Sequence, residues 1–213
     1  MLQRFRLRGG DAVYGSLVLT RRDSFACPDL SPVDAYGVAD RTAICPSQPL
    51  VQELVIEDCR RVAASYSWAG LELVALGFVG RGEDFFNSIC FCSACRYGYG
   101  AVDGILETVA RERVEHPSLN TLLLWRRSVQ YGLLQQIRAV VGVPLWLRTA
   151  ASLRYTGDMS SLTFEEARGL VDACTVTGED VERLAGLARP MPIYGIAMPE
   201  HEMFAGHIEL EEE

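Results

Sequence analysis

The chain has 213 residues and a formal charge of −8, and 49% of its residues are hydrophobic and 23% charged. This composition predicts one soluble globular domain over residues 1–213, large enough to bury its own hydrophobic core. The negative charge argues against nucleic acid as a partner, because phosphate binding needs a positive surface, and no apolar run is long enough to span a membrane.

The first predicted elements are a strand, a long loop and a helix. Residues 14–20 form an apolar run typical of a buried strand, and the loop that follows leads to a Cys-Pro turn at residues 45 and 46. We expect Ser47 to cap a helix that has Pro49 in its first turn, because apolar residues then recur at helical spacing. Gly70 is predicted to end this helix, and residues 71–78 to form the second strand.

The second half continues the alternation of helices and strands. Helices are predicted at 101–114 and 119–141, and strands at 143–149, 170–176 and 193–198. Thr163 and Glu166 form a capping box for a short helix, and residues 179–188 are also expected to be helical. The apolar face of the long helix consists of Leu122, Trp125, Val129, Leu133, Ile137 and Val140. Parallel strands need helical crossovers, so the pattern predicts an α/β fold with a parallel sheet.

Cysteine is the most informative residue type in the sequence. One cysteine lies in the Cys-Pro turn, and residues 90–95 carry three more in a Cys-x-Cys-x-x-Cys motif. Four thiolates satisfy a tetrahedral zinc ion, and a short motif closed by one distant cysteine can supply them. We therefore predict a structural zinc site, called here the four-cysteine site, formed by Cys45, Cys90, Cys92 and Cys95.

Two disulfides, or four reduced thiols in the core, are the alternatives to zinc. Disulfides suit small secreted domains, whereas this chain has an odd total of seven cysteines and shows no charged-then-apolar leader. A reducing, cytoplasmic setting is therefore expected. The remaining cysteines, Cys27, Cys59 and Cys174, stand singly and are predicted to be small buried residues rather than ligands.

The order of a Cys-Pro turn, a helix, a strand and a Cys-aromatic-Cys-x-x-Cys run resembles the zinc knuckle of glycoside hydrolase family forty-two β-galactosidases. It is more similar still to glycoside-hydrolase-like barrel proteins of actinobacteria, over roughly residues 40 to 150. The stretches that carry this likeness are residues 44–49, 71–80 and 89–96. The resemblance implies a (β/α) barrel with a structural zinc bound at the four-cysteine site.

The chain is short for a closed barrel. We predict about five strands, whereas such a barrel has eight strands and about 250 residues. An unclosed parallel sheet exposes a hydrophobic edge that invites aggregation unless something covers it. We therefore predict a partial (β/α) TIM-type barrel completed by a partner subunit, either a different chain or a second copy. A compact open sheet, or strands unrecognised within residues 1–40, is the alternative.

Candidate site residues are those near the carboxyl ends of strands, where barrel active sites lie. Arg148 and Trp146 share a face of the third predicted strand and are candidates for substrate binding, although Arg148 could equally pair with Asp172. Asp172 itself is a candidate catalytic carboxylate, with a structural hydrogen bond as the alternative. Further charged residues follow the second strand; they are Arg81, Glu83 and Asp84.

Glu200 follows the fifth predicted strand. The resemblance to barrel glycosidases implies a catalytic nucleophile at this position. A glycosidase needs a second carboxylate facing the first across the scissile bond. The second strand offers only Glu72, near its beginning, and has Val74 where the similar actinobacterial proteins have another carboxylate. This departure argues against glycoside hydrolysis, and a salt-bridged or surface role is the alternative to catalysis for Glu72.

His201 lies between two glutamates and is a candidate proton carrier near neutral pH, with an ordinary surface role as the alternative. All twenty basic residues are arginine. Pyridoxal-phosphate (PLP) enzymes, Schiff-base aldolases and P-loops need a lysine amine, so the chain alone cannot be one of these. Arginine can still bind an anionic group through paired hydrogen bonds, and a GC-rich genome is an alternative cause of the bias.

Three functions are compatible with these observations. The first is a subunit of a small-molecule enzyme of actinobacterial secondary metabolism, with lyase or ring-closing chemistry in which Arg148 binds the leaving anion and a carboxylate or His201 is the base. The second is a glycosidase acting on a sugar. The third is a non-catalytic scaffold subunit that completes or regulates a partner. Loss of the glycosidase carboxylate pair favours the first.

Overall fold

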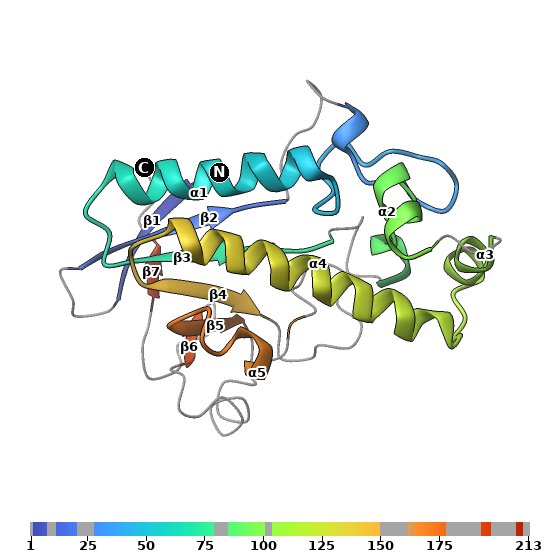
Figure 1. Ribbon diagram of the computed structural model, residues 1–213. Helices are drawn as coiled ribbons and strands as arrows, with labels where there is room; N and C mark the ends of the chain where they lie inside the picture. Colours follow the sequence, from blue (N-terminus) through green and yellow to red (C-terminus); the bar gives the residue numbers. More distant parts are fainter. Residues whose placement is uncertain are drawn as a thin grey trace.

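The computed structural model describes residues 2–7, 12–20, 28–78, 85–100, 104–149, 162, 164–177, 193–196 and 208–210. In this part of the chain a seven-stranded sheet has the order β6-β5-β4-β3-β2-β1-β7. The strands are β1 (Leu2–Leu7), β2 (Val13–Val18), β3 (Gly70–Val74), β4 (Leu145–Thr149), β5 (Ala173–Thr177), β6 (Ile193–Ile196) and β7 (Ile208–Leu210). Figure 1 shows the sheet crossed on one side by two long helices.

The strands from β2 to β6 are parallel, and neighbours in the sequence are neighbours in the sheet. This arrangement confirms the predicted α/β fold with a parallel sheet. β1 pairs antiparallel with β2, and β7 pairs antiparallel with β1. The outer edge of β2 is therefore covered by the chain itself, as in the alternative of an unrecognised strand within residues 1–40.

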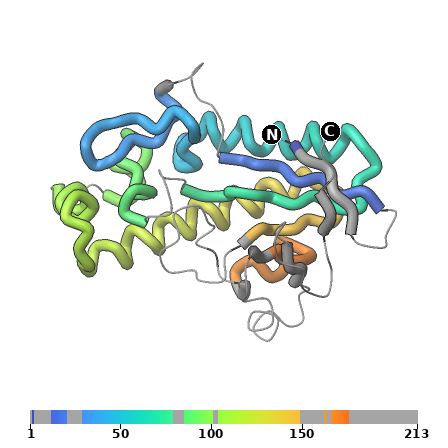
Figure 2. Tube along the Cα trace, turned by 180° about the vertical axis from the view of Figure 1, so that it is seen from behind, coloured from blue at the N-terminus to red at the C-terminus, as the bar shows by residue number. Residues whose placement is uncertain are grey.

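Two long helices, α1 (Pro49–Ser65) and α4 (Ser118–Val140), lie against the same face of the sheet. Figure 2, seen from behind, shows the strands in front of both helices. The short helices α2 (Ser93–Gly98) and α3 (Ile105–Glu112) and the 3-10 turn η2 (Phe85–Ser88) are located toward the first residues of α4. The 3-10 turn η1 (Pro28–Leu30) lies by the start of α1. The last described helix is α5 (Phe164–Ala167).

The main hydrophobic core lies between the sheet and the two long helices. The strands supply alternate leucines to it, such as Leu71 and Leu73 on β3, and each is fully buried. α1 presents Val51, Val55 and other apolar residues to it at helical spacing. Successive side chains of a strand point to opposite faces of the sheet. Because Leu71 and Leu73 of β3 face the helices, Glu72 between them faces the other side. No helix in the described part of the chain is long and apolar enough to cross a lipid bilayer.

The boundaries of several predicted elements differ from those in the structure. The residue that precedes α1 is Gln48, not Ser47, and its side chain makes no capping hydrogen bond. The helix ends at Ser65 rather than at Gly70, which begins β3. β3 is five residues long and stops at Val74, short of the predicted strand end at residue 78. Residues 163 and 179–188, where we predicted a helix cap and a helix, lie outside the described residues.

Candidate functional site

The structure brings the four-cysteine site together at one point. The sulfur atoms of its four members, all of them buried, lie within 4.8 Å of one another. The Sγ of Cys45 is 3.4 Å from that of Cys95 and 3.7 Å from that of Cys92. Four sulfurs bound to one ion at the usual zinc distance of about 2.3 Å lie about 3.8 Å apart, so the spacing suits a single tetrahedral ion. The cysteines are free thiols, not disulfides.

Backbone hydrogen bonds hold both halves of this site in place. The peptide N–H of Ile44 donates to Thr20 O just past β2, and the N–H of Cys45 donates to Leu30 O. On the other side, Phe91 N–H donates to Val33 O. The Cys-Pro loop and the Cys-x-Cys-x-x-Cys turn are thereby joined beyond the carboxyl ends of β2 and β3. This is the end of the sheet at which a barrel active site lies.

Polar hydrogens surround the sulfur atoms. The Ser47 hydroxyl is 3.0 Å from Cys45 Sγ and 3.1 Å from Cys95 Sγ. The peptide N–H groups of Val33 and Cys92 each donate to Cys90 Sγ at 3.4 Å. Such contacts stabilise thiolate rather than thiol. Ser47, which we predicted as a helix cap, instead supports the four-cysteine site.

Burial by itself opposes ionisation of these thiols. It raises the pKa of Cys45 and of Cys95, whereas hydrogen bonds from neighbouring thiols, Cys45 first, lower the pKa of Cys92. Four thiolates in one buried cluster require a cation, and zinc is the metal ion that fits four thiolate ligands at this spacing. The donor set therefore fits a bound divalent metal ion, with the role of joining two loops.

A second polar cluster lies on the face of the sheet opposite the long helices, called here the inner face. Its centre is Glu72 on β3, whose side chain is fully buried. Arg148 on β4 donates to its two carboxylate oxygens from Nε at 3.0 Å and from Nη2 at 2.7 Å. Thr175 on β5 donates its hydroxyl to the same carboxylate. Arg148 thus pairs with Glu72 and not with Asp172, the alternative considered from the sequence.

The rest of the inner face is aromatic and polar. Trp146 is 5% exposed and packs its ring against Tyr14 of β2, with the ring centroids 4.7 Å apart. Ser16, the register partner of Glu72 on β2, is buried and its hydroxyl makes no hydrogen bond. Such an unpaired buried hydroxyl is uncommon in native proteins, and it marks this face as a place where a ligand atom or water could bind.

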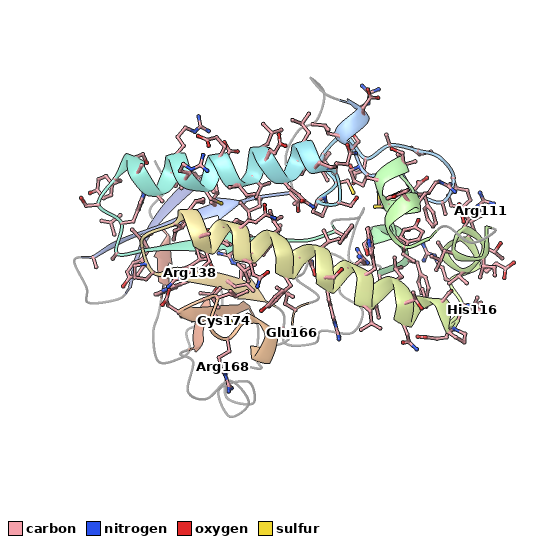
Figure 3. All side chains as sticks on the ribbon, in the orientation of Figure 1. Arg111, His116, Arg138, Glu166, Arg168 and Cys174 are labelled. Carbon is pink, nitrogen blue, oxygen red and sulfur yellow. The ribbon has the colours of Figure 1, made fainter. Side chains whose placement is uncertain are left out.

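Asp172 lies at the other end of the sheet. It immediately precedes β5, and its carboxylate accepts a 2.7 Å hydrogen bond from Leu145 N–H at the start of β4. It also forms an ion pair with Arg138 of α4 at 2.9 Å. Figure 3 labels Arg138 beside the strands, and Arg111 and His116 at the far end of the molecule. These contacts match the structural role that we considered as the alternative to catalysis.

The structure tests the isolated cysteines but only some of the candidate catalytic residues. Cys59 and Cys174 are buried, as predicted. Glu200 and His201 lie outside the described residues, as do Cys27, Arg81, Glu83 and Asp84, so their roles stay predictions. Sequence reasoning missed the roles of Ser47 and Thr175, whose only signal was their closeness to Cys45 and Cys174, and it missed Ser16, which no sequence signal marked.

The sequence matches no known protein family and no curated protein. Its fold is similar to that of several solved structures, two of which follow. The catalytic domain of a β-amylase from Paenibacillus polymyxa aligns with a TM-score of 0.57 at 11% identity, over 88% of this chain and 70% of that one. The PgaB (BpsB) glycoside hydrolase domain from Bordetella bronchiseptica aligns with a TM-score of 0.52 at 12% identity, over 82% of this chain and 52% of that one.

These likenesses concern the fold. The chain has the architecture of a partial (β/α) barrel similar to those of glycoside hydrolases, and it spans 70% and 52% of the two domains. The barrel implied by the sequence resemblance is thereby confirmed at the level of fold. The specific likeness to glycoside hydrolase family forty-two stays a prediction.

Proposed function

We propose that this chain is a subunit of a barrel enzyme that acts on an anionic small molecule, with Arg148 as the residue that binds the anion. The observation that carries this proposal is the buried ion pair between Glu72, in the middle of β3, and Arg148, near the carboxyl end of β4. Such an ion pair holds a guanidinium group in one orientation. The position is the one at which substrates bind in barrel enzymes.

The geometry of Arg148 supports its role toward an anion. Its Nε and Nη2 atoms face Glu72, which leaves Nη1 on the other side of the planar group. The side chain is 25% exposed, while the Glu72 side chain is fully buried. Arg148 can therefore offer hydrogen bonds to a substrate oxygen while Glu72 fixes its orientation. Trp146 and the unpaired hydroxyl of Ser16 would form the neighbouring wall of this site.

The hydrogen bonds of the Glu72 carboxylate favour an elimination or ring-closing reaction over glycoside hydrolysis. The Glu72 carboxylate already accepts hydrogen bonds from Arg148 and Thr175, so its oxygens are committed to neighbouring strands and are not placed to serve a glycosidic leaving group. In our proposal Arg148 stabilises a departing anion, and Glu200 or His201 supplies the base. The four-cysteine site would hold a structural zinc ion at the same end of the sheet. Secondary metabolism of actinobacteria and a cytoplasmic location complete the proposal.

We also propose that a partner subunit completes the barrel. Among the described strands, β6 pairs only with β5 and β7 only with β1, so these strands do not close into a ring. A second chain, identical or different, that adds units beside β6 would cover this parallel edge. Co-purification followed by native mass spectrometry measures both the subunit composition and the bound metal. A monomer that binds the substrate and turns it over would contradict this part.

A glycosidase remains the second candidate, because a β-amylase catalytic domain and a glycoside hydrolase domain are among the solved structures with a similar fold. In that case Glu200 would be the nucleophile, and its partner carboxylate would come from outside the described residues or from the partner subunit. Glu72 would then act only by orienting Arg148.

Calorimetric titration of the purified complex distinguishes these functions. We expect small sulfate, phosphate or carboxylate compounds to bind, and Arg148→Ala to weaken that binding by about tenfold or more, the loss of one charged hydrogen-bond donor. Arg138→Ala is the matched control, because Arg138 pairs with Asp172 at the opposite end of the sheet. Binding of neutral oligosaccharides alone would favour the glycosidase. Binding of neither class would leave the scaffold role.

A further inference from the structure

A fully enclosed arginine lies next to the four-cysteine site. Arg126 of α4 is only 4% exposed. Its guanidinium group donates to the backbone oxygens of Phe78 and Ser88 at 3.2 and 3.0 Å, and to the Ser88 hydroxyl at 3.1 Å. It also stacks on the ring of Phe78 at 4.5 Å and lies 5.6 Å from the ring of Phe85. Its Nε is buried and makes no hydrogen bond.

None of these contacts carries a formal negative charge. Each ion pair found in the described part of the chain involves another arginine. A buried cation without a counter-charge is costly, because it loses its hydration, and carbonyl oxygens and aromatic rings offset only part of that cost. Arg126 therefore requires a source of negative charge nearby.

Among the residues that the structure describes, the four-cysteine site is the candidate for that source. Phe78, on which Arg126 stacks, packs in the same buried cluster as the four cysteines. Burial lowers the pKa of Arg126 to about 10, and the thiolates of Cys95, Cys90 and Cys45 act in the opposite direction. Arg126 thus keeps its charge at neutral pH. Four neutral thiols would not compensate it, whereas four thiolates around a divalent ion carry a net charge of about −2.

We propose that Arg126 is the counter-charge of a metal-bound tetrathiolate at the four-cysteine site, so that metal binding and the buried arginine stabilise each other. The inference stands apart from the proposed enzymatic function. It distinguishes a metal centre from a set of reduced core thiols, because only the former supplies the negative charge. It also links the metal to the fold: through Arg126, α4 holds the segment after β3 and the turn η2 against the metal site.

Competition with a chromophoric chelator measures zinc affinity in the folded protein. Arg126→Gln keeps hydrogen-bond donors for the carbonyl oxygens but removes the charge, and we expect it to weaken zinc binding about 10- to 100-fold, the usual effect of losing an outer-sphere partner. Arg126→Lys keeps the charge and should stay within about threefold of the parent affinity. Arg61→Gln is the control, because that side chain is 73% exposed on α1. Equal zinc affinity for the parent and Arg126→Gln would overturn the proposal.

Thermal unfolding with and without metal gives a second readout, one that a purely structural role would not reproduce. With zinc bound, Arg126→Gln should lower the melting temperature. With zinc removed by chelator, the same change should be neutral or raise it, because the uncompensated charge is gone. Equal losses in both states would mean that Arg126 serves only as a hydrogen-bond donor. If Arg126→Gln does not fold with zinc, the affinity of Arg126→Lys decides: a loss of tenfold or more despite the retained charge contradicts the proposal.

Discussion

At the scale of single residues, Glu72 and Arg126 are the most deeply buried charged side chains in the described part of the chain, and they are compensated in different ways. Glu72 has a charged partner and a hydroxyl donor on neighbouring strands, so its charge is balanced within the sheet. Arg126 has carbonyl oxygens and aromatic rings, with the sulfur atoms of the four-cysteine site beyond them. Buried charges that persist despite their desolvation cost are typical of functional or metal-binding sites.

Substitution of Glu72 tests the energetic role of the inner-face ion pair. Glu72→Gln leaves Arg148 without its counter-charge in a largely buried site, so we expect unfolding free energy to fall by about 2 to 3 kcal/mol, below the full cost of breaking a buried pair because Arg148 is partly hydrated. Denaturant unfolding measures this loss. Glu57→Gln, which breaks an exposed pair with Arg60 on α1, should cost less than about 1 kcal/mol. Similar losses for both variants would contradict a special role for Glu72.

The residue scale is also where prediction from sequence reached its limit. Cysteine spacing predicted which four thiols come together, because a tetrahedral ion restricts the number and separation of its donors. Arg126 lies four residues after Leu122, on the buried face of α4, whereas the neighbouring Arg127 points elsewhere and is less buried. The apolar period of α4 predicted the face containing Leu122, Leu133 and Ile137, yet Arg126 and Gln130 lie buried in the same helix. Periodicity counts apolar residues and cannot recognise a buried polar one that has its own partners.

At the scale of elements, the short segments around α2 are held by close packing beside the four-cysteine site. Gly98, the last residue of α2, lies against Trp125 of α4, and a Cβ atom at this glycine would come within 2.4 Å of the Trp125 ring. The indole ring in turn packs on Tyr99 and Phe78, which belong to the surroundings of the four-cysteine site. The approach of α2 to α4 therefore requires a residue without a side chain.

Two glycine substitutions on neighbouring helices test this contact. Gly98→Ala should destabilise the protein by about 1 to 3 kcal/mol, since the added methyl group displaces a ring within a packed cluster. Gly132→Ala, in the middle of α4 with open space around it, should instead stabilise it by about 0.5 to 1 kcal/mol, because alanine favours the helix. Urea denaturation of both variants gives the comparison. A loss at Gly132 as large as that at Gly98 would point to a general intolerance of substitution.

Loss of one ligand tests the metal at the same scale. Cys92→Ser should destabilise the segment from Cys45 to Cys95 by several kcal/mol, on the order of 3 or more, because the binding energy of a structural metal is folding energy. Metal analysis and thermal unfolding measure the change together. Cys59→Ala is the control: it removes a buried thiol of the main core and should leave metal content intact. Unchanged melting of Cys92→Ser together with absent zinc in the parent protein would falsify the site.

At the scale of elements the sequence predicted the order of β2 to β6 because each is an apolar run between helical segments. It did not predict β1 (Leu2–Leu7), in which arginine and glutamine interrupt the apolar residues, nor the three-residue β7. The pairing of β1 with β7 joins the two ends of the described chain, and such a long-range pairing is not encoded in the local pattern.

At the scale of the whole molecule, the buried residues fall into separate clusters. One contains the sheet leucines with α1 and the carboxyl-terminal half of α4. The others contain the four-cysteine site with Phe78, and the side chains around η2, α3 and the start of α4. α4 passes from one region to the other, and Arg126 and Gln130 hydrogen-bond to the segment that follows β3 at the crossing. The metal is thus expected to stabilise one region more than the other.

Amide hydrogen exchange with and without chelator tests this division. Removal of the metal should accelerate exchange strongly in α2, η2 and the loop that contains Cys45, because these short elements have few other contacts that order them. The strands β2 to β4 and helix α1, whose core excludes the four-cysteine site, should keep most of their protection. In Arg126→Gln with zinc present, exchange in η2 should rise toward the metal-free value, since that variant loosens the same junction. Uniform acceleration across the whole chain would instead mean that sheet and metal region unfold as one cooperative unit.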